Sequence, residues 1–402
     1  MSCRALPLIL LAAALASAQE KPFLDTQLIF PLDKLHNHSS AVVELPGGEL
    51  FTVWYRGSGE RTADDVVIMS SRLRRGAKAW TPPLVIADTP GFPDCNPAAF
   101  VDSRRRLWLM WPVILANEWH TALMKYRISS NYADSTKPPR WDISDNMLFV
   151  PRNFTDVARR AIEPRLKSAT PGTPQETYLK RLWENSGDKY FMRMGWMPRS
   201  RPVELPSGRI IVPLYSDGYD FSLMAITDDG GLTWSTSEPL VGAGNIQPSI
   251  ARKRDGTLVA YMRDNGPAPK RLHVSESKDD GITWSPVRDS EFPNPGSGAD
   301  IIVLKNGMWA LIYNDTERER HSLAISLSDD EGATWKWKRH LELDTRAERR
   351  SSFHYPSILQ ASDGTLHATY SYFINHLPNT EPRKSIKHAH CNLAWLQQTT
   401  PQ

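Results

Sequence analysis

The stretch Ser277-Lys-Asp-Asp-Gly-Ile-Thr-Trp284 occurs in three versions along the chain. The other two are Thr227-Asp-Asp-Gly-Gly-Leu-Thr-Trp234 and Ser328-Asp-Asp-Glu-Gly-Ala-Thr-Trp335, so the shared pattern is [Ser/Thr]-x-Asp-x-Gly-x-Thr-Trp. The three tryptophans lie 50 and 51 residues apart. A fixed period of this size is typical of a repeat architecture in which each repeat is one supersecondary unit.

The residue types of this pattern favour a structural role. Aspartate hydrogen-bonds back to nearby amides and glycine adopts positive φ, so both are turn residues. We expect the threonine and tryptophan to start or end a strand, with the tryptophan filling the gap between one sheet and the next. The motif therefore predicts a fold and not an active site.

The repeated stretch resembles the Asp box, or BNR repeat, of the sialidase superfamily. The resemblance implies an all-β fold, a six-bladed β-propeller with Asp-box repeats in its outer turns. Further hairpin turns, each followed by an apolar run, fit this fold; they lie at 46–48, 205–208, 305–307 and 362–364. We expect the last strand, over 387–395, to complete the final blade beside the N-terminal strand.

Residues 112–195 break the repeating pattern. They predict a loop and helix insertion, with a short helix over 156–167 and a loop over 171–176. Long loops on a rigid scaffold commonly shape a binding site, so we expect this insertion to lie over one face of the ring.

The N-terminus predicts export. Arg4 precedes an apolar run over 6–16, and Ala16-Ser-Ala18 has the small-x-small pattern of a signal peptidase site. We expect a signal peptide over 1–18, a sialidase-like propeller domain over 19–402, and a secreted or periplasmic protein. The apolar run is too short to span a bilayer, and no other membrane span is expected.

Charge and cysteine content exclude several classes of function. The formal net charge is only +3, and the basic residues are scattered and form no stripe; we therefore expect no nucleic-acid partner. No Cys/His spacing indicates a metal site, and no cofactor is expected. Cys95 and Cys391 either pair across the two ends of the chain or remain two buried thiols.

The resemblance also implies a catalytic site. Sialidases clamp the carboxylate of an acidic sugar with arginines, and a tyrosine attacks the sugar. Arg263, in Ala260-Tyr-Met-Arg263, resembles the second clamp arginine. Arg320, just ahead of the third Asp box, resembles the third, with Arg318 as the alternative. Tyr355, in Phe353-His-Tyr-Pro-Ser-Ile358, resembles the nucleophile.

The N-terminal repeat supplies the remaining catalytic candidates. Arg56, in Trp54-Tyr-Arg56, lies where the family has an arginine after the first hairpin. In the following loop Glu60 is the best-placed carboxylic acid/base for the leaving oxygen. Asp64 and Asp65 are the alternatives.

Two positions depart from the family pattern. The place of the first clamp arginine is occupied by His36-Asn-His-Ser39, and the place of the glutamate that deprotonates the tyrosine is occupied by Gln247. Gln247 cannot act as a base but can bind a hydroxyl. His36 or His38 can donate to a sugar or act as a base near neutral pH. Other polar residues that we expect to line the pocket are Asn96, Arg199, Arg201, Asp217 and Asp220.

These residues predict an exo-acting glycoside hydrolase that resembles an exo-α-sialidase and acts on a terminal, acidic sugar of a glycan. The two departures leave the identity of the sugar open. One alternative is an atypical glycosidase or a polysaccharide lyase on another acidic glycan, with His38 or Tyr355 as base. Another is a non-catalytic glycan-binding propeller, which the loss of the glutamate favours.

Overall fold

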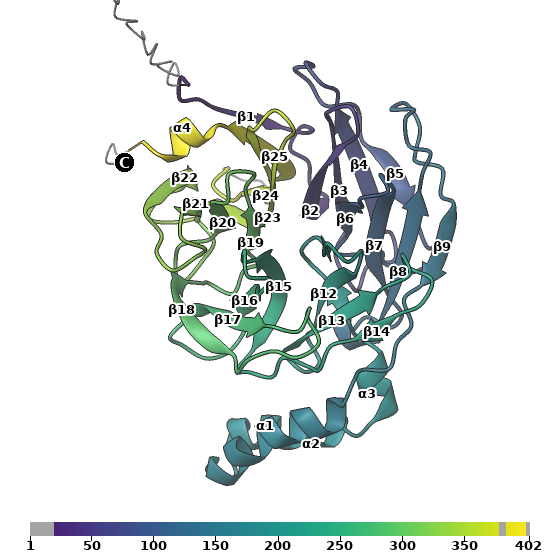
Figure 1. Ribbon diagram of the computed structural model, residues 1–402, viewed down its shortest axis with the longest axis vertical. Coiled ribbons are helices and arrows are strands. Elements are labelled where there is room, and N and C mark those ends of the chain that lie inside the picture. Colours follow the sequence, from purple (N-terminus) through teal and green to yellow (C-terminus); the bar gives the residue numbers. More distant parts are fainter. Residues whose placement is uncertain (1–19, 378–382, 399–402) are drawn as a thin grey trace, which may run out of the picture.

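Six antiparallel sheets surround a common centre (Figure 1). The computed structural model describes residues 20–377 and 383–398 of the chain. The sheets follow one another in sequence order, and successive sheets contact one another around the centre. The predicted all-β, six-bladed propeller is confirmed.

Each sheet is one blade of the ring, and five of the six have four strands. Blade 1 contains β2 (His36–Leu45), β3 (Glu49–Gly57), β4 (Val67–Leu73) and β5 (Leu84–Ala87). Blade 2 contains β6 (Ala98–Val101), β7 (Leu107–Ile114), β8 (Ala122–Ser129) and β9 (Ile143–Asn146). Blade 3 contains β10 (Met197–Pro198), β11 (Val203–Glu204), β12 (Ile210–Ser216), β13 (Phe221–Thr227) and β14 (Ser235–Thr236).

The second half of the ring repeats the same up-and-down order. Blade 4 contains β15 (Asn245–Arg252), β16 (Leu258–Asp264), β17 (Arg271–Ser277) and β18 (Arg288–Pro293). Blade 5 contains β19 (Asp300–Val303), β20 (Trp309–Tyr313), β21 (Ser322–Ser328) and β22 (Trp337–Leu343). Blade 6 contains β23 (Ser352–Gln360), β24 (Leu366–Ile374), β25 (Arg383–Cys391) and β1 (Leu24–Leu28).

The ring is closed by the two ends of the described chain. β1 pairs antiparallel with β25, with Leu24 opposite Cys391 and Leu28 opposite Lys387. The pairing is the one expected from the sequence, although β25 ends at Cys391 and is followed by the short helix α4 (Leu393–Leu396). Cys95 and Cys391 are both buried free thiols, so the structure has the second of the two cysteine arrangements. The signal peptide expected over 1–18 lies outside the described residues.

The inserted segment is shorter than the expected 112–195. Residues 112–146 largely belong to blade 2, and the helices follow it: α1 (Phe154–Ser168), α2 (Pro174–Asn185) and α3 (Lys189–Arg193). The segment 171–176, expected as loop, already contains the start of α2, because Pro174 occupies its first turn and Thr173 caps it. In the described residues, no helix has the length and apolar composition that a membrane crossing requires.

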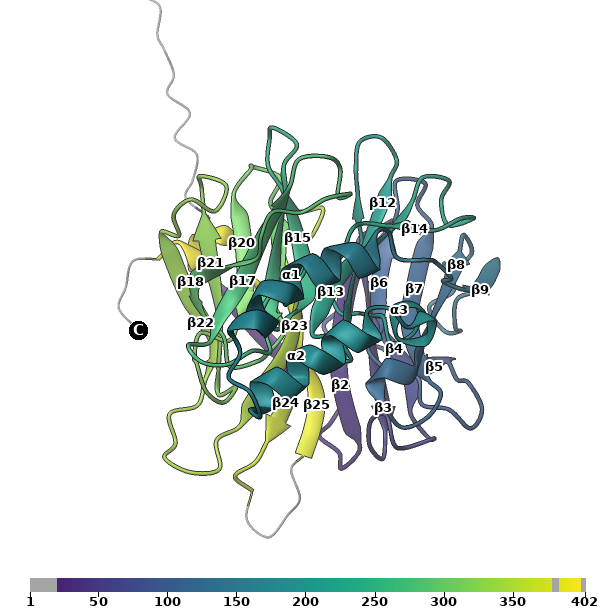
Figure 2. The same ribbon diagram turned by 90° about the horizontal axis from the view of Figure 1, so that it is seen from below.

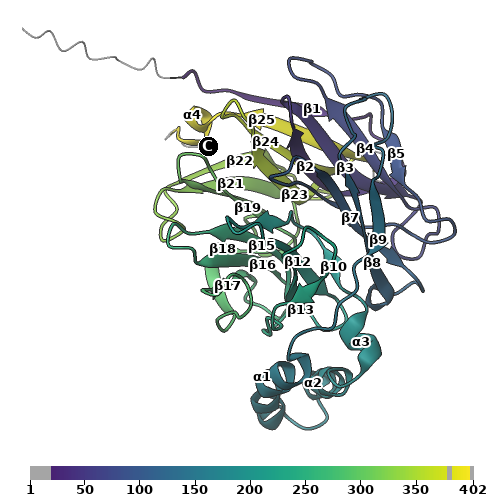
Figure 3. The same cartoon turned by 45° about the vertical axis from the view of Figure 1, so that its right-hand side comes forward.

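The helices pack on the outer side of the ring and not over a face (Figures 1, 2 and 3). The expected position over a face was therefore wrong. The apolar residues Phe154, Leu179 and Leu182 are buried in one cluster with Trp196 and Tyr219 of the blade 3 region. Burial of this apolar stripe against the side of a blade holds the helix pair away from the centre.

The Asp boxes are turns between the third and fourth strands of blades 3, 4 and 5. In each box the aspartate accepts hydrogen bonds from the threonine four residues later: Asp279 from Thr283 N (2.9 Å) and Oγ1 (2.6 Å). Asp229 and Asp330 make the same two contacts with Thr233 and Thr334. The motif is thus a self-contained turn.

Each box tryptophan lies between its own blade and the preceding one. Trp335 of blade 5 packs edge-on against Phe292 of blade 4, with ring centroids 5.1 Å apart. Trp234 of blade 3 packs in the same way against Tyr126 of blade 2. This confirms the structural role expected for the motif.

Asp279→Ala is expected to lower the free energy of unfolding by about 1–2 kcal/mol, because three hydrogen-bond donors of this turn lose the carboxylate that accepts from them. The donors are Ser277 Oγ, Thr283 N and Thr283 Oγ1. Urea denaturation measures the change. Asp280→Asn is the matched control, since asparagine tolerates the positive φ of that position. Equal stability of Asp279→Ala and the wild type would contradict the assigned role.

Three histidines stack in parallel where blade 6 meets blade 1. His367 on β24 lies 4.2 Å from His390 and 5.2 Å from His388, measured between ring centroids. His367 Nδ1 and His388 Nε2 are hydrogen-bonded at 2.9 Å. Burial, followed by the neighbouring histidines, lowers the pKa of His367 to about 4 and that of His388 to about 3, although Asp363 partly opposes this at His367. The fold therefore holds both imidazoles neutral.

This stack predicts a loss of stability in mild acid. The unfolded chain binds these protons at its ordinary histidine pKa near 6.5 while the folded chain does not, so the stability present above pH 6.5 falls as the pH drops towards the folded values. Between pH 7 and 5, His367 and His388 are each expected to lower the free energy of unfolding by about 2 kcal/mol. The double variant His367→Phe/His388→Phe, which keeps ring shape but does not titrate, should lose correspondingly less. Parallel pH curves from chemical denaturation of the two proteins would contradict this.

Candidate active site

The catalytic candidates lie at the face of the ring opposite the Asp boxes. Because adjacent strands are antiparallel, the turns between second and third strands lie at one face and the Asp-box turns at the other. Glu60, Asp217 and Arg320 lie in second–third turns of blades 1, 3 and 5, and Arg263 lies near the end of the second strand of blade 4. Residues from separate blades thus share one face.

Inner strands of three blades carry the same backbone device. Ser39, Gln247 and Tyr355 have positive φ values of 57°, 56° and 47°. Each lies at a break in strand register, between His38 and Ala41, Ile246 and Ser249, and His354 and Ser357. Such bulges redirect side chains, and a positive φ is unusual for an aromatic residue. The strained Tyr355 therefore marks a candidate functional position.

The phenol oxygen of Tyr355 receives two hydrogen bonds. Arg263 Nη1 donates to it at 2.9 Å and Gln247 Nε2 at 3.0 Å. Gln247 thus lies where its sequence position suggested, beside Tyr355, and acts as a donor.

The ring of Tyr355 is flanked by an imidazole and two further guanidinium groups. His38 stacks on it with centroids 4.5 Å apart. Arg199 Cζ lies 4.9 Å and Arg320 Cζ 5.5 Å from the ring centroid. Together with Arg263, three cations converge on one phenol.

Within the part of the chain that the structure describes, these three arginines carry charge that no carboxylate neutralises. Arg199 is 1% exposed and donates to Pro356 O at 2.8 Å. Arg320 donates to Gly296 O at 2.6 Å and contacts His354 Nδ1 at 2.9 Å. Among the described residues, none of the three forms an ion pair with a carboxylate. Guanidinium groups without a carboxylate partner form a site for an anion, which they bind through charge-assisted hydrogen bonds.

Glu60 is part of a hydrogen-bonded network on blade 1. Tyr55 donates to Glu60 Oε1 at 2.7 Å, and His36 Nε2 lies 2.9 Å from the same oxygen. Lys384 Nζ donates to His36 Nδ1 at 2.9 Å, so the proton of a neutral His36 lies on Nε2 and points to Glu60. Burial alone would raise the pKa of Glu60, but the contacts with His36 and Tyr55 outweigh it and the pKa is lowered. Glu60 is therefore ionised.

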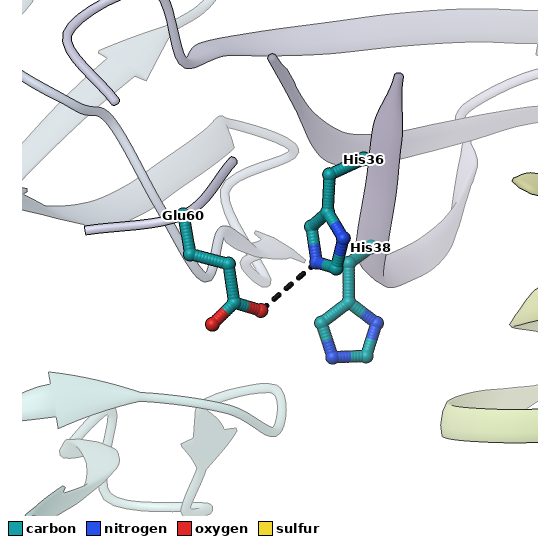
Figure 4. A group of neighbouring side chains, drawn as sticks. All are labelled: His36, His38 and Glu60. Carbon is teal, nitrogen blue, oxygen red and sulfur yellow. Dashed lines mark hydrogen bonds and ion pairs between the residues drawn. The ribbon is translucent and has the colours of Figure 1, made fainter. Parts of the chain in front are cut away.

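The side chains of His36, His38 and Glu60 have the composition of a metal site (Figure 4). Their potential ligand atoms lie within 4.8 Å of one another. However, Lys384 donates to Nδ1 of His36, the ring nitrogen on the far side from Glu60. In a metal-bound histidine, the nitrogen that does not bind the metal usually donates to a carboxylate or carbonyl instead. With the His36 Nε2 proton directed at Glu60, the group is better described as a hydrogen-bonded network.

His38 is a neutral imidazole in the centre of the ring. Burial, then the charges of His36 and His354, hold its pKa well below the usual value. Its Nδ1 contacts Ser371 Oγ at 2.8 Å, and that hydroxyl also accepts from Ser39 N at 3.1 Å. His38 can therefore bind a sugar hydroxyl without adding charge.

Other candidates are placed away from this convergence. Arg56 forms an ion pair with Asp33 at 2.8 Å. Asp64, Asp65 and Arg318 are exposed, and Asp65 accepts hydrogen bonds from Ser58 in its own loop.

Asn96 and Arg201 make structural contacts. Asn96 is buried and donates to Tyr215 Oη at 3.2 Å. Arg201 pairs with Asp300.

Tyr55 and Lys384 were not expected at the site from the sequence, and Asp217 was expected only as a residue that lines the pocket. Tyr55 belongs to the apolar strand β3, and Lys384 lies 348 residues from its partner His36. No local pattern connects them. For Asp217 the available signal was a polar Ser-Asp-Gly turn directly after a buried strand, β12.

The chain matches a known protein family. The profile of the BNR repeat-like domain matches residues 48–155 and 183–368. The sialidase of Micromonospora viridifaciens is 28% identical over 180 residues, which is 42% of this chain and 25% of that protein. The matched regions span about a quarter of the length of the curated relatives.

Two solved structures show the same fold over almost the whole chain. A protein of unknown function from Dyadobacter fermentans has a TM-score of 0.66 at 16% identity, covering 92% of this chain and 99% of its own. The intramolecular trans-sialidase of Ruminococcus gnavus, in complex with oseltamivir carboxylate, has a TM-score of 0.65 at 12% identity, covering 91% and 96%. With the profile matching most of its length, this chain belongs to the BNR repeat-like domain family of the sialidase superfamily.

Proposed function

We propose that the protein is an exo-acting glycoside hydrolase that removes a terminal acidic sugar from a glycan. The observation that carries this proposal is the convergence of Arg199, Arg263 and Arg320, none paired with a carboxylate among the described residues, on the phenol of Tyr355. The names of the relatives, a sialidase and a trans-sialidase, support the same class of reaction.

The residues have distinct roles in this proposal. Arg263 and Arg320 bind the anionic group of the sugar, and Arg199 adds positive charge beside the aromatic ring of Tyr355. Tyr355 attacks the anomeric carbon, since a neutral phenol approaches an anionic sugar without charge repulsion. Glu60, which the sequence placed as acid/base for the leaving oxygen, is ionised, and we assign it instead the role of the general base that takes the phenol proton. Gln247 holds the phenol oxygen in position.

The remainder of the glycan has room beside Arg320. A cavity of about 600 Å³ adjoins this arginine and is lined also by Arg349, Arg350 and Asn375. We propose that the glycan is the protein's partner and that it is met outside the cytoplasm, as the N-terminal segment 1–18 suggests.

A panel of chromogenic glycosides tests the proposal. It contains sialosides, uronosides and neutral sugars of the same leaving group. Release of the chromophore from an acidic member, with a saturated sugar as product, supports a hydrolase. A product with a new ultraviolet-absorbing double bond identifies a lyase, and preference for neutral sugars overturns the acidic-sugar proposal.

A glycan-binding protein without catalysis is the second candidate, because Gln247 stands where the tyrosine's base is expected. In that case an acidic glycan binds but stays intact over long incubation. Tyr355→Phe and Glu60→Gln would then leave its Kd unchanged, as measured by calorimetry.

A further inference from the structure

Asp217 lies in a tight turn at the catalytic face. The turn joins β12 to β13 and is fixed by Asp220 N, which donates to Ser216 O at 2.8 Å, and by Gly218 N, which donates to Ser216 Oγ at 3.2 Å. Asp220 has a positive φ of 55°. The position of Asp217 is therefore set by backbone geometry.

A chain of hydrogen bonds ties this turn to Tyr355. Arg263 donates through Nη1 to the phenol oxygen at 2.9 Å and through Nη2 to Asn265 Oδ1 at 3.1 Å. Asn265 Nδ2 donates to Asp220 Oδ1 at 2.6 Å, and Tyr178 donates to Asp220 Oδ2 at 3.0 Å. The side chain of Asp220 thus connects the turn that carries Asp217 to the residue that holds the phenol of Tyr355.

The carboxyl group of Asp217 differs from those of Asp220 and Glu60. It is half-buried and makes no hydrogen bond with any residue in the described ranges. The charged groups that face it are Arg263 on β16, Arg61 and Glu60 in the blade 1 loop, and Asp220 in its own turn. Burial is the main cause that raises the pKa of Asp217 to about 6; Asp220 and Glu60 act in the same direction, whereas Arg263 and Arg61 oppose it.

We propose that Asp217 is the proton donor to the leaving group, and that Glu60 acts only as the base. This assignment rests on the proposed function. Two carboxyl groups at one site whose environments favour opposite protonation states are the arrangement that acid and base catalysis requires. A carboxyl group free of hydrogen bonds is also free to give its proton to a substrate.

In the first chemical step, Tyr355 Oη forms a bond to the anomeric carbon, and the phenol proton goes to Glu60. The bond between the anomeric carbon and the leaving oxygen breaks with its electron pair on that oxygen, which takes the proton of Asp217. The resulting Asp217 carboxylate lies near Arg263 and Arg61. In the second step it takes a proton from the water that displaces Tyr355, while Glu60 returns its proton to the phenol oxygen.

Asp217→Asn tests the assignment through the leaving group. A nitrophenolate leaves without protonation, whereas a sugar alkoxide needs a proton. In the variant, kcat/KM should fall about 100-fold for an oligosaccharide that ends in the acidic sugar, but stay within about fivefold of the wild type for a nitrophenyl glycoside. The ratio kcat/KM is the quantity to compare, because it reports only the steps up to the departure of the leaving group. The fall in wild-type kcat/KM for the oligosaccharide above about pH 6 should be absent in the variant.

Asp220→Asn is the matched control, because it alters the fastening of the turn and should lower both rates by the same factor. Equal losses on both substrates for Asp217→Asn overturn the assignment and leave the hydrolase intact. Absence of turnover by the wild type on every glycoside overturns the proposed function together with it. Infrared difference titration of the wild type against Asp217→Asn supplies a readout without turnover: a protonated carboxyl band that disappears near pH 6 supports the assignment, and its absence at pH 5 overturns it.

Discussion

Tyr355→Phe is expected to lower kcat on an acidic glycoside by about 10³-fold or more while leaving substrate affinity within about twofold. The change removes only the phenol oxygen, which accepts from Arg263 and Gln247. The ring keeps its stacking on His38 and its contacts with Arg199 and Arg320. The anion site should therefore survive while the nucleophile is lost. Steady-state kinetics and calorimetric binding measure the two effects separately.

Tyr219→Phe is a suitable control, because Tyr219 is also buried and its hydroxyl donates to a backbone carbonyl, that of Asn185, away from the phenol of Tyr355. It should change stability and leave kcat close to that of the wild type. Mass spectrometry after reaction with a slow fluorinated substrate analogue should find the sugar on the peptide containing Tyr355. Unchanged turnover by Tyr355→Phe would assign the attack to water and remove Tyr355 from the mechanism.

The fold was predictable because the Asp box is local. The carboxylate of Asp279 and all of its hydrogen-bond donors lie within Ser277–Thr283, so seven residues of sequence contain the whole turn. Trp284 extends the same stretch to the neighbouring blade. A motif with this content and a fixed period determines blade, ring and approximate strand positions together.

The sequence predicts that the insertion contains a helix, but not which surface of the ring the helix packs against. The amphipathic pattern of α1 shows that one face must be buried, but not against which surface. Its partners are Trp196 and Tyr219, which follow the helices in the chain. Only the assembled ring shows that these residues lie on its outer side.

The site was predictable only where a residue is tied to a repeat. Arg263, Arg320 and Tyr355 lie at fixed positions relative to turns and Asp boxes, and the structure brings their side chains together. The ionised state of Glu60 depends instead on contacts that only the fold creates, those of its carboxylate with His36 and Tyr55. Such contacts have no signature in a single sequence, so the base and the acid could not be told apart.

Arg263→Ala is the second change with a large expected effect. The guanidinium group is expected to bind the anion of the sugar and also holds Tyr355 Oη and Asn265 Oδ1. Loss of a charge-assisted bidentate contact costs about 2–3 kcal/mol, which corresponds to a rise in KM of about 100-fold for an acidic substrate. The value of kcat should fall as well, because Tyr355 loses its main anchor.

The comparison of charged and neutral substrates separates these two contributions. For a neutral analogue of the same sugar, only the anchoring of Tyr355 is lost, so KM should hardly change while kcat still falls. Arg263→Lys should recover part of the affinity, because it restores the charge without the guanidinium fork. Arg318→Ala, an exposed arginine two residues from Arg320, controls for a general effect of positive charge and should leave both parameters near the wild-type values. If Arg263→Ala also left them there, the acidic sugar would have to be bound by Arg320 without Arg263, and the proposed anion site would be wrong.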